Sequence, residues 1–513
     1  MINSAAILDH HVAVRPDKPA IIWPGGSYTY SQLFDRVNAV AAALASKGVR
    51  QGDHIALLMQ NTPEFIETLY AVNRLGAAFL PLNFRLAPTE WRYILEHGQA
   101  KAIVTEAKFE AELAHVIEGL PLPIALTIDR PETCAFDSYH DLIEAHRGAQ
   151  VAPEDVSADA LQRLMYTSGT TARPKGVCIT HGNFAWKNLG MLLQFGWNDT
   201  EVTVVGGPLY HVGALDMGGL TTLHAGGTII LQRKFDSDNL IALIEEHRAT
   251  NCWLAPSMVN LVLQSAELHK RDVSSLGLIL SGGEKMPEAR LKQILDALPG
   301  VWFADAYGLT ETVSSDSFID RDHMKSKLGS VGIPLPHQEI RIVNEVGESV
   351  PVGAIGEIAV RGPKTFRGYW RDPQATATAI RDGWFHTGDM GRLDADGYLY
   401  VEDRKKDMIV SGGENIATPE IERVLYEHES VLEAAVIGHP DAKWGEVPRA
   451  YVVLRDGHTV TAVELITFCR ERLAKYKVPR HVQFVSSLPR TPSGKVLKRE
   501  LRVRQSISGG GDR

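Results

Sequence analysis

Cysteine is scarce in this 513-residue chain, which contains only Cys134, Cys178, Cys252 and Cys469 and no CxxC pair. Cysteines this far apart lack the spacing of a zinc site, so the pattern argues against a metal held by thiolates. It favours reduced thiols with a structural role.

Long apolar runs are also missing, because no window approaches ~18 uninterrupted apolar residues, the length that spans a bilayer. Residues 1–14 show no basic region followed by an apolar stretch, so the sequence predicts no signal peptide. We therefore expect a soluble, cytosolic protein without a transmembrane segment. The net charge is -9, and the short basic run 404–406 has acids on both sides. This balance argues against nucleic acid as the main partner.

The composition is otherwise that of a globular protein, with 44% hydrophobic and 22% charged residues. A chain of this length predicts two or more domains. In the first part, helix-like and strand-like segments alternate. Ser31 is a candidate cap for a helix over 33–44, which Gly48 ends, and residues 55–59 follow as a strand.

A second round of the same alternation follows. Pro63 and Pro88 each predict the start of a helix, and residues 78–80 and 102–105 read as strands. Alternation of this kind predicts an α/β fold of layers around a largely parallel sheet.

From residue 339 onward the pattern favours short strands, at 340–343, 358–360 and 399–401, followed by a compact C-terminal unit. In that unit we expect helices over 419–426 and about 463–473, and strands over 434–437 and 451–454. Six consecutive charged residues, 402–407, separate the two regions. Such a run is costly to bury, so we expect it to be exposed, either as a hinge or as an ordinary solvated connector.

The most informative stretch is 166–176, which crowds hydroxyls, glycines and two cations into one loop. Hydroxyl and backbone N–H donors can surround phosphate oxygens, and Arg173 and Lys175 supply positive charge. The Walker spacing is absent, and the apolar residues on either side predict a loop between two strands. A surface turn would have a similar composition, so this loop alone leaves both interpretations open.

Further blocks follow in a fixed order. Together with the loop they occupy residues 167–175, 210–211, 281–284, 305–311, 384–389, 403–415 and 489–499. Over nearly its whole length the chain resembles the adenylate-forming acyl-CoA synthetases, the superfamily that includes firefly luciferase and the adenylation domains of nonribosomal peptide synthetases. One block alone is a weak signal, but the order and spacing together are specific.

The resemblance implies a large N-terminal AMP-binding domain (1–402) of layered α/β subdomains with a β-rich subdomain at about 339–402. A hinge (403–407) and a small, mobile α+β C-terminal domain (408–513) would follow. It also implies ATP, Mg²⁺ and coenzyme A as the molecules that the protein binds. The implied ATP/AMP-binding residues are Thr167, Ser168, Gly169, Thr170, Thr171, Lys175, Gly283, Glu284, Asp305, Ala306, Tyr307, Asp389 and Arg404.

Within this set the resemblance assigns individual roles. Tyr307 would stack on adenine, Asp305 would accept from its amino group, and Asp389 would bind the ribose hydroxyls. Thr310 would contact the α-phosphate, and Glu311 would ligate Mg²⁺, which prefers carboxylate oxygen.

The implied catalytic residues are Thr310, Glu311, His211 and Lys495. Lys495 would neutralise the charge that develops as a carboxylate attacks the α-phosphate. His211 would line the acyl site, although a lone histidine in an apolar stretch is more often a core residue. The implied hinge residue is Lys406.

Small residues surround His211. They would suit a broad pocket for an aromatic or polycyclic acid, or they would equally serve helix packing. The implied acyl-pocket residues are His211, Gly213, Ala214, Met217, Gly282 and Ala306. The implied coenzyme A contacts are Gly412, Gly413, Lys443 and Trp444. Two positions depart from the family pattern, because Ala172 and Ala306 stand where glycine is usual.

The function that follows is ligation of a small carboxylic acid to coenzyme A through an acyl-adenylate. Two alternatives remain open at this point, a free-standing adenylation enzyme that loads a carrier protein and a noncatalytic acyl- or nucleotide-binding derivative. A luciferase-like oxygenase is a further option. The acid itself, and whether the chain forms a homo-oligomer, are not predicted.

Overall fold

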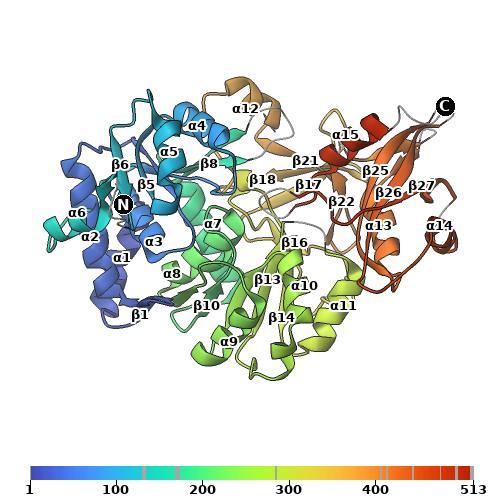
Figure 1. The fold of residues 1–513 in the computed structure, drawn as a ribbon, viewed down its shortest axis with the longest axis horizontal. Coiled ribbons are helices and arrows are strands. Elements are labelled where there is room, and N and C mark those ends of the chain that lie inside the picture. The colour runs from blue at the N-terminus through green and yellow to red at the C-terminus, as the bar shows by residue number, and fades with distance from the viewer. Residues whose placement is uncertain are drawn as a thin grey trace.

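The computed structural model describes residues 2–129, 135–167, 174–283, 286–404, 407–411, 414–441, 444–473, 475–490 and 495–508. A broad N-terminal part contains two large sheets with their covering helices, and the C-terminal part with α13–α15 stands at one end of the molecule (Figure 1). This arrangement agrees with the predicted α/β class and with a large domain followed by a small one.

The first sheet contains, among the described residues, eight strands in the order β19-β9-β8-β4-β3-β5-β6-β7. Their bounds are β3 (His54–Leu58), β4 (Ala78–Pro81), β5 (Ala100–Thr105), β6 (Ile124–Thr127), β7 (Asp137–Ser138), β8 (Leu161–Thr167), β9 (Lys175–Thr180) and β19 (Gly368–Tyr369). The pairs β3·β4, β3·β5, β5·β6 and β4·β8 are parallel, as the alternating pattern predicts.

The second sheet has, within the same residues, nine strands in the order β16-β15-β14-β13-β12-β10-β11-β1-β2. Their bounds are β1 (Pro19–Trp23), β2 (Gly26–Thr29), β10 (Val202–Val205), β11 (Thr228–Leu231), β12 (Asn251–Leu254), β13 (Leu278–Gly282), β14 (Trp302–Tyr307), β15 (Ser317–Phe318) and β16 (Ile333–Pro334). The central pairs β10·β11, β10·β12, β12·β13 and β13·β14 are parallel.

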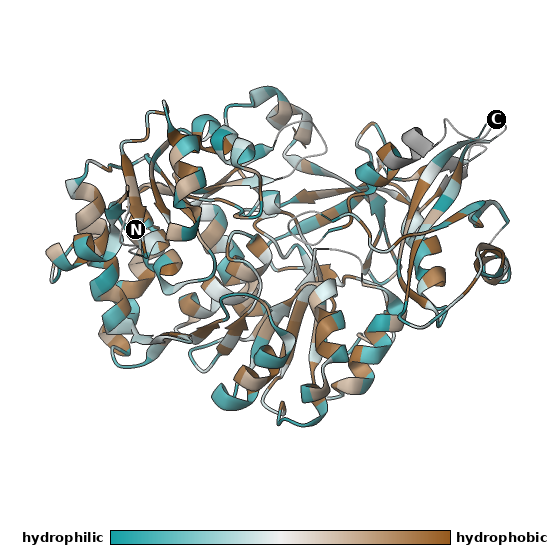
Figure 2. Ribbon diagram, viewed as in Figure 1, coloured by the Kyte–Doolittle hydropathy of each residue, from teal (hydrophilic) through white to brown (hydrophobic). Residues whose placement is uncertain are grey.

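Helices cover both sheets. They are α1 (Ile7–Val14), α2 (Tyr30–Ser46), α3 (Pro63–Arg74), α4 (Pro88–His97), α5 (Glu110–Ile117), α6 (Tyr139–Ala145), α7 (His181–Phe195), α8 (Thr221–Ala225), α9 (Ser237–His247), α10 (Pro256–Gln264) and α11 (Glu288–Ala297). The largest apolar core joins α2 and α3 to strands of both sheets. Hydrophobic residues accordingly concentrate on the central strands, and polar residues lie on the outer helix faces (Figure 2).

Local signals place most helix starts correctly. Both predicted proline starts are confirmed, since α3 begins at Pro63 and α4 at Pro88. The prediction for α2 is wrong by two residues: Thr29, not Ser31, is the cap. Thr29 accepts from the Gln32 N–H, and the Gln32 side chain returns to the Thr29 N–H, a reciprocal pair that satisfies two backbone donors.

The β-rich region forms a separate sheet of β17 (Glu339–Val343), β18 (Gly356–Arg361), β20 (Ile380–Arg381), β21 (Trp384–Leu393) and β22 (Leu399–Arg404), beside α12 (Pro373–Ala379). The C-terminal sheet contains β23 (Ile409–Ser411), β24 (Glu414–Ile416), β25 (Val431–Asp441), β26 (Gly445–Leu454) and β27 (His481–Phe484). With it pack α13 (Thr418–Tyr426), α14 (Ala462–Arg470) and α15 (Lys498–Ser508). The strands and helices predicted for both regions are confirmed.

Two carboxylates of the charged run at 402–407, Asp403 and Asp407, are not exposed as predicted, whereas residues 405–406 lie outside the described residues. Asp403 is 7% exposed and Asp407 9%. Oδ2 of Asp403 accepts from the N–H and the hydroxyl of Thr418 at 2.9 and 2.8 Å, and Oδ1 of Asp407 accepts from Arg502 at 2.7 Å. The desolvation cost of these carboxylates is therefore offset by charge-assisted hydrogen bonds.

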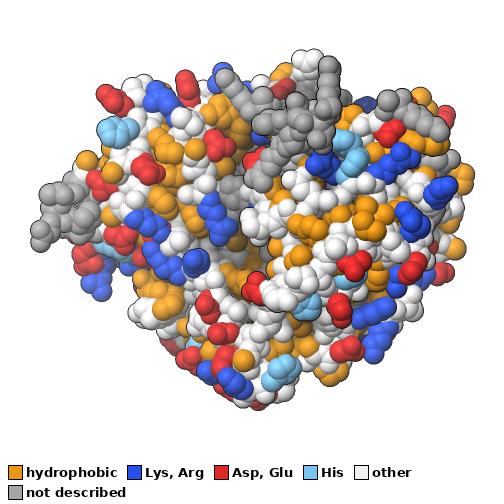
Figure 3. Space-filling model, turned by 45° about the vertical axis from the view of Figure 1, so that its right-hand side comes forward, with side chains coloured by type: hydrophobic (Ala, Val, Ile, Leu, Met, Phe, Trp, Pro, Cys, Tyr) orange, Lys and Arg blue, Asp and Glu red, His pale blue; other side chains and the backbone are white. Residues whose placement is uncertain are grey.

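Several other features bear on the sequence predictions. Cys178, Cys252 and Cys469 are buried and unpaired, whereas Cys134 lies outside the described residues. In the described ranges, no helix combines the length and the hydropathy needed to cross a membrane. On the face shown in Figure 3, acidic and basic side chains are interspersed.

Candidate active site

A cleft of about 1700 Å³ lies between the N-terminal and C-terminal parts. The predicted site residues that line it are Thr167, Lys175, His211, Gly213, Met217, Gly282, Gly283, Asp305, Ala306, Tyr307, Thr310, Glu311, Asp389 and Lys495. The fold thus gathers residues separated by more than 300 positions into one cavity.

Other predicted residues fall elsewhere. Ser168, Gly169, Thr170, Thr171, Ala172, Arg173, Glu284, Lys406, Gly412, Gly413, Lys443 and the Arg404 side chain lie outside the described residues. Ala214 is not among the lining residues and packs into the largest core, so its place in the acyl pocket stays a prediction. Trp444 is 38% exposed and also lies outside the cleft lining.

The strands on either side of the predicted loop are present. β8 and β9 are antiparallel, and their register runs from the pair Leu161–Thr180 to the pair Thr167–Lys175. Thr167 and Lys175 are opposite one another where this ladder ends at the cleft. Residues 168–173 lie outside the described residues, but the residues on either side of them, Thr167 and Lys175, line the cleft.

Two parallel strands, β13 and β14, deliver the next residues at their carboxyl ends, where open α/β sheets bind ligands. Gly283 has φ +96°, a conformation that suits glycine. The hydroxyl of Tyr307 donates to Oδ2 of Asp389 at 2.8 Å. Burial, with Asp389 nearby, raises the pKa of Tyr307 well above its usual value, so the phenol stays protonated. Asp389 in turn pairs through the backbone with Arg404.

A left-handed turn follows β14. Three consecutive non-glycine residues, Val313, Ser314 and Ser315, have φ of 53°, 63° and 55°. Each such residue costs about 1–2 kcal/mol. A Cβ on Gly308 would lie 2.3 Å from the Ser315 nitrogen, so only glycine fits where the turn folds back.

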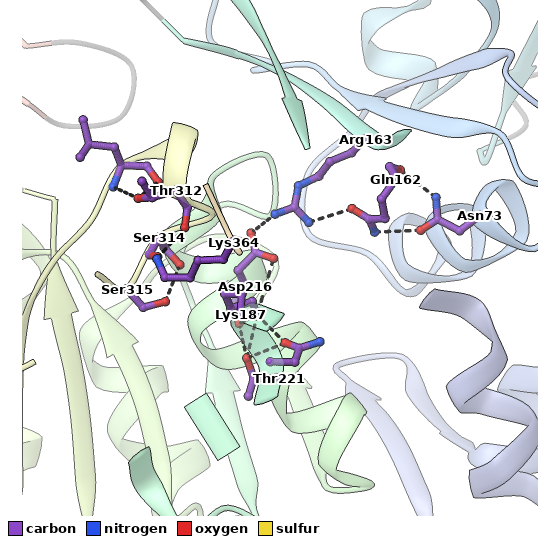
Figure 4. Close-up of polar contacts among 12 residues, drawn as sticks. Asn73, Gln162, Arg163, Lys187, Asp216, Thr221, Thr312, Ser314, Ser315 and Lys364 are labelled. Carbon is purple, nitrogen blue, oxygen red and sulfur yellow. Dashed lines mark hydrogen bonds and ion pairs between the residues drawn. The ribbon is translucent and has the colours of Figure 1, made fainter. Parts of the chain in front are cut away.

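A buried lysine holds this turn. The ammonium of Lys364, whose side chain is 3% exposed, donates to the carbonyls of Thr312 and Ser314 at 2.8 and 2.7 Å and to Asp316 at 2.5 Å. Figure 4 shows its side chain reaching into the turn. The contacts satisfy carbonyls that the irregular backbone leaves without secondary-structure partners.

The carboxylate of Glu311 has its own partner. Tyr369 donates its hydroxyl to Oε1 of Glu311 at 2.9 Å, and the ammonium of Lys175 lies 4.9 Å from the centroid of the Tyr369 ring. Sequence analysis missed Lys364 and Tyr369. No local periodicity marks them, because their partners lie about 50 residues or more away in the chain.

Lys495 reaches this end of the cleft from the C-terminal part. Its Cε lies 3.8 Å from the position that a Cβ on Gly283 would occupy. His211 is close enough to be affected by this cation: burial first, then Lys495 and Arg85, lower the pKa of His211 to about 4. The imidazole is therefore neutral near pH 7, and its buried Nε2 has no hydrogen-bond partner among the described residues.

Another part of the cleft wall is built around Trp253 of β12. A Cβ on Gly213 would lie 2.5 Å from Cζ2 of Trp253, and one on Gly207 would lie 2.6 Å from Cζ3. These glycines therefore accommodate the indole ring, and both also line the cleft, so the small residues serve packing as well as the cavity wall. Gly282 similarly faces Ala306, whose carbonyl would be 2.9 Å from an added Cβ.

A network of buried charges is centred on Asp216 (Figure 4). Asp216, on the π-helical segment Gly213–Leu220, forms an ion pair of 2.6 Å with Arg163 and one of 3.7 Å with Lys187. Lys187 also donates to the Asp216 carbonyl and to Thr221 at 2.8 and 2.9 Å. Burial lowers the pKa of Lys187 to about 7. The network ties the segment that carries Gly213 and Met217 to β8 and α7.

The donor set at the cleft suits magnesium more than zinc. The described residues contain no group of three or more His, Cys, Asp or Glu placed to hold a metal ion. Mg²⁺ is commonly bound by one or two carboxylates together with phosphate oxygens, and Glu311 offers one carboxylate beside the phosphate-loop strand. The residues present therefore fit a magnesium ion that arrives with a nucleotide.

Comparisons with known proteins agree with this geometry. The family described as AMP-binding enzyme matches residues 8–370, and its C-terminal domain family matches residues 420–495. A feruloyl-CoA synthase from Amycolatopsis is 40% identical over 96% of each chain, and an indoleacetate–CoA ligase from Aromatoleum aromaticum is 38% identical over 96% of each. The structure of o-succinylbenzoate CoA synthetase from Bacillus subtilis, solved with its acyl-adenylate intermediate, superposes with a TM-score of 0.86 at 33% identity over 97% of each chain.

These matches cover both the cleft and the part that carries Lys495. ATP and coenzyme A are substrates of ligases of this kind, which form an acyl-adenylate before the thioester. The chain therefore belongs to the AMP-binding enzyme family and is an ATP-dependent acyl-CoA synthetase.

Proposed function

We propose that this synthetase acts on an aromatic carboxylic acid. The observation that carries the proposal is the indole of Trp253, fixed by the close approach of Gly207 and Gly213. A rigid aromatic wall in the cleft that the neutral ring of His211 also lines favours a flat acyl group, because aromatic rings gain from stacked or edge-to-face contact. Two relatives support it, since their names give feruloyl and indoleacetate as acyl groups.

In the proposed first half-reaction, a carboxylate oxygen of the acid attacks the α-phosphorus of ATP, and pyrophosphate leaves. Lys495 and Thr310 offset the charge that builds on the α-phosphate, and Lys175 with the loop 167–175 holds the outer phosphates. Magnesium, held by Glu311 and phosphate oxygens, would supply further positive charge there.

The nucleotide base and sugar have separate contacts in this proposal. Tyr307 supplies the flat surface for adenine, and Asp305 accepts from its amino group. Asp389 keeps acceptor capacity for the ribose hydroxyls after accepting from Tyr307, because a carboxylate has about four lone-pair sites. Gly283 allows close approach to the backbone.

In the second half-reaction, the thiol of coenzyme A attacks the acyl carbonyl and AMP leaves. We propose that the C-terminal domain, 408–513, rotates about Lys406 to admit this thiol. The position of Lys495 inside the cleft, with Trp444 outside its lining, is the arrangement that adenylation needs. Rotation would bring Gly412, Gly413, Lys443 and Trp444 toward the acyl-adenylate, as the family resemblance suggests.

A carboxylate panel tests the proposed substrate class. Release of AMP in the presence of coenzyme A should be highest for hydroxycinnamic, indolic or benzoic acids and at least about tenfold lower for saturated fatty acids of equal length. A preference for saturated chains would contradict the proposal. Pyrophosphate exchange does not distinguish the two acceptors, because adenylate formation precedes transfer to either. Thioester formation with coenzyme A, and separately with a carrier protein bearing phosphopantetheine, distinguishes them.

A further inference from the structure

A nine-residue segment, residues 362–370, contacts both β9 and the left-handed turn that follows β14. We call it the brace. Its second half pairs with β9, the strand that leaves the phosphate loop: Tyr369 is opposite Val177, and Trp370 donates its N–H to the Gly176 carbonyl at 2.7 Å. The N–H of Arg367 also donates to Cys178 at 3.0 Å. The brace is therefore fixed to the phosphate-loop side of the cleft.

The brace also contacts the left-handed turn, residues 310–316. The Phe366 N–H donates to the carbonyl of Glu311 at 2.7 Å, and the Tyr369 hydroxyl donates to its carboxylate at 2.9 Å. The three hydrogen bonds from Lys364 hold the rest of the turn. Backbone and side chain of Glu311 are thus both bound by one short segment.

The turn needs an external support. Its residues 313–315 have positive φ without being glycine, and such backbone persists only when surrounding contacts over-determine it. Lys364 supplies those contacts from inside the protein, and Asp316 completes them by accepting from Thr312 at 2.5 Å. The position of Thr310 and Glu311 therefore depends on residues about 50 positions later in the chain.

We propose that Lys364 and Tyr369 are positioning residues for adenylate formation, which hold Thr310 and Glu311 at a fixed place relative to the phosphate-loop strand. Lys364 acts through the backbone of the turn. Tyr369 acts through the Glu311 carboxylate, which it orients with its hydroxyl while its ring face receives the ammonium of Lys175. This inference rests on the proposed role of Glu311 as the magnesium ligand.

Tyr369 does more than pack against its neighbours. Its ring packs against Phe366 at 4.9 Å, but the residue also lines the cleft, and its hydroxyl reaches a carboxylate that lines the cleft as well. Removing the hydroxyl leaves the ring contacts with Phe366 and Lys175 intact. The variant Tyr369→Phe therefore isolates the positioning of Glu311.

A matched control exists outside the cleft. Tyr398 donates its hydroxyl to Asp320 at 2.6 Å, an equivalent tyrosine–carboxylate pair that does not line the cavity. Tyr369→Phe and Tyr398→Phe should lower thermal stability by similar small amounts. Only Tyr369→Phe should weaken binding of ATP in the presence of Mg²⁺, by roughly tenfold in calorimetric dissociation constant, since a hydrogen bond to a charged group is lost. Binding of ATP with EDTA in place of Mg²⁺ should change less than twofold.

The same dependence should be visible in kinetics. Tyr369→Phe should raise the Mg²⁺ concentration needed for half-maximal pyrophosphate exchange by roughly tenfold and leave conversion of supplied acyl-adenylate to thioester unchanged. In a Glu311→Gln background, Tyr369→Phe should add less than about twofold, because a residue that acts through Glu311 has nothing left to position. Lys364→Met should lower the rate of pyrophosphate exchange, provided that circular dichroism shows the native fold.

The outcomes separate the two proposals. If Glu311→Gln leaves the Mg²⁺ dependence unchanged, the proposed metal role of Glu311 is wrong. If Glu311→Gln shifts that dependence while Tyr369→Phe binds ATP with Mg²⁺ as tightly as the wild type, the positioning role of Tyr369 is overturned. Equal effects of Tyr369→Phe and Tyr398→Phe on binding of ATP with Mg²⁺ would show that the brace stabilises the fold without positioning Glu311.

Discussion

The hydroxyl of Tyr307 donates to Oδ2 of Asp389 at 2.8 Å, which joins the carboxyl end of β14 to β21 of the β-rich sheet. Both side chains are buried, Tyr307 at 7% exposure and Asp389 at 4%. The bond fixes the orientation of the phenol ring beside this carboxylate. It connects the two parts of the N-terminal domain at the point where we propose that the adenosine binds.

Replacing Tyr307 by Phe tests this connection. The ring remains, so stacking with adenine should persist, but Asp389 loses a buried donor. We expect the free energy of unfolding to fall by about 1–3 kcal/mol and the KM for ATP to rise several-fold. Urea unfolding and pyrophosphate exchange measure the two effects. An unchanged KM would show that the orientation of Asp389 does not matter for the nucleotide.

Gly213→Ala should disturb Trp253, since the added Cβ would lie 2.5 Å from its ring. Overpacking of this kind costs about 1–3 kcal/mol. The double variant Gly213→Ala, Trp253→Leu should recover stability but accept aromatic acids less well. Gly300→Ala is the control, because nothing lies within 4 Å of its Cβ position. Failure of the double variant to recover would argue against a direct clash.

Lys495→Ala should lower the rate of adenylate formation by roughly 100-fold or more, because its charge acts while the α-phosphate is attacked. Conversion of supplied acyl-adenylate to thioester should be spared. The control Lys475→Ala removes an exposed lysine that does not line the cleft and should leave both rates unchanged.

Lys406→Pro should show the opposite defect to that of Lys495→Ala, because proline fixes φ and would obstruct rotation at a hinge. Pyrophosphate exchange should persist while thioester formation from supplied adenylate falls. Parallel loss of both activities in the two variants would argue against domain rotation in this chain.

Protonation of His211 should destabilise the protein in acid. Burial lowers the pKa of His211 to about 4 from the ordinary 6.5, so the unfolded chain binds a proton more readily than the folded one between these values. The neutral imidazole of His211 contributes its full share to the free energy of unfolding above pH 6.5. This share is lost as the pH falls toward 4, a change on the order of 3 kcal/mol. His211→Phe should flatten the dependence of unfolding free energy on pH between 4 and 6.5, whereas His458→Phe, at an exposed position, should leave it unaltered.

Local patterns in the sequence predicted the elements of this fold well. Proline at Pro63 and Pro88 marks two helix starts because its missing N–H is one that a first helical turn leaves unused. The capping residue of α2 was missed because Thr29 and Ser31 are chemically alike, and only the reciprocal bond with Gln32 selects between them. Many of the residues that the motifs predicted for the nucleotide site line one cleft, and each block keeps these residues within a few positions.

The supporting contacts could not be predicted in this way. Lys364 and Tyr369 reach partners 48 and 58 residues away, and neither stands in a periodic pattern. Asp403 belongs to a run of charges that reads as solvated, yet it is buried because Thr418 offers it two donors. The sequence left open whether Gly213 provides pocket space or serves packing, and the close approach of the Trp253 ring is visible only in the structure.

The sequence by itself determined the fold class, the family and a set of candidate reacting groups, because alternating apolar patterns and short motifs act over a few neighbouring residues. Only the tertiary structure decided how those groups are held. Whether a lysine is solvated or braces a strained turn, and whether a glycine leaves a cavity or admits an indole ring, depends on which distant segments pack against it. The same residue type affects stability and the shape of a site differently when it is solvated and when it is packed in the interior.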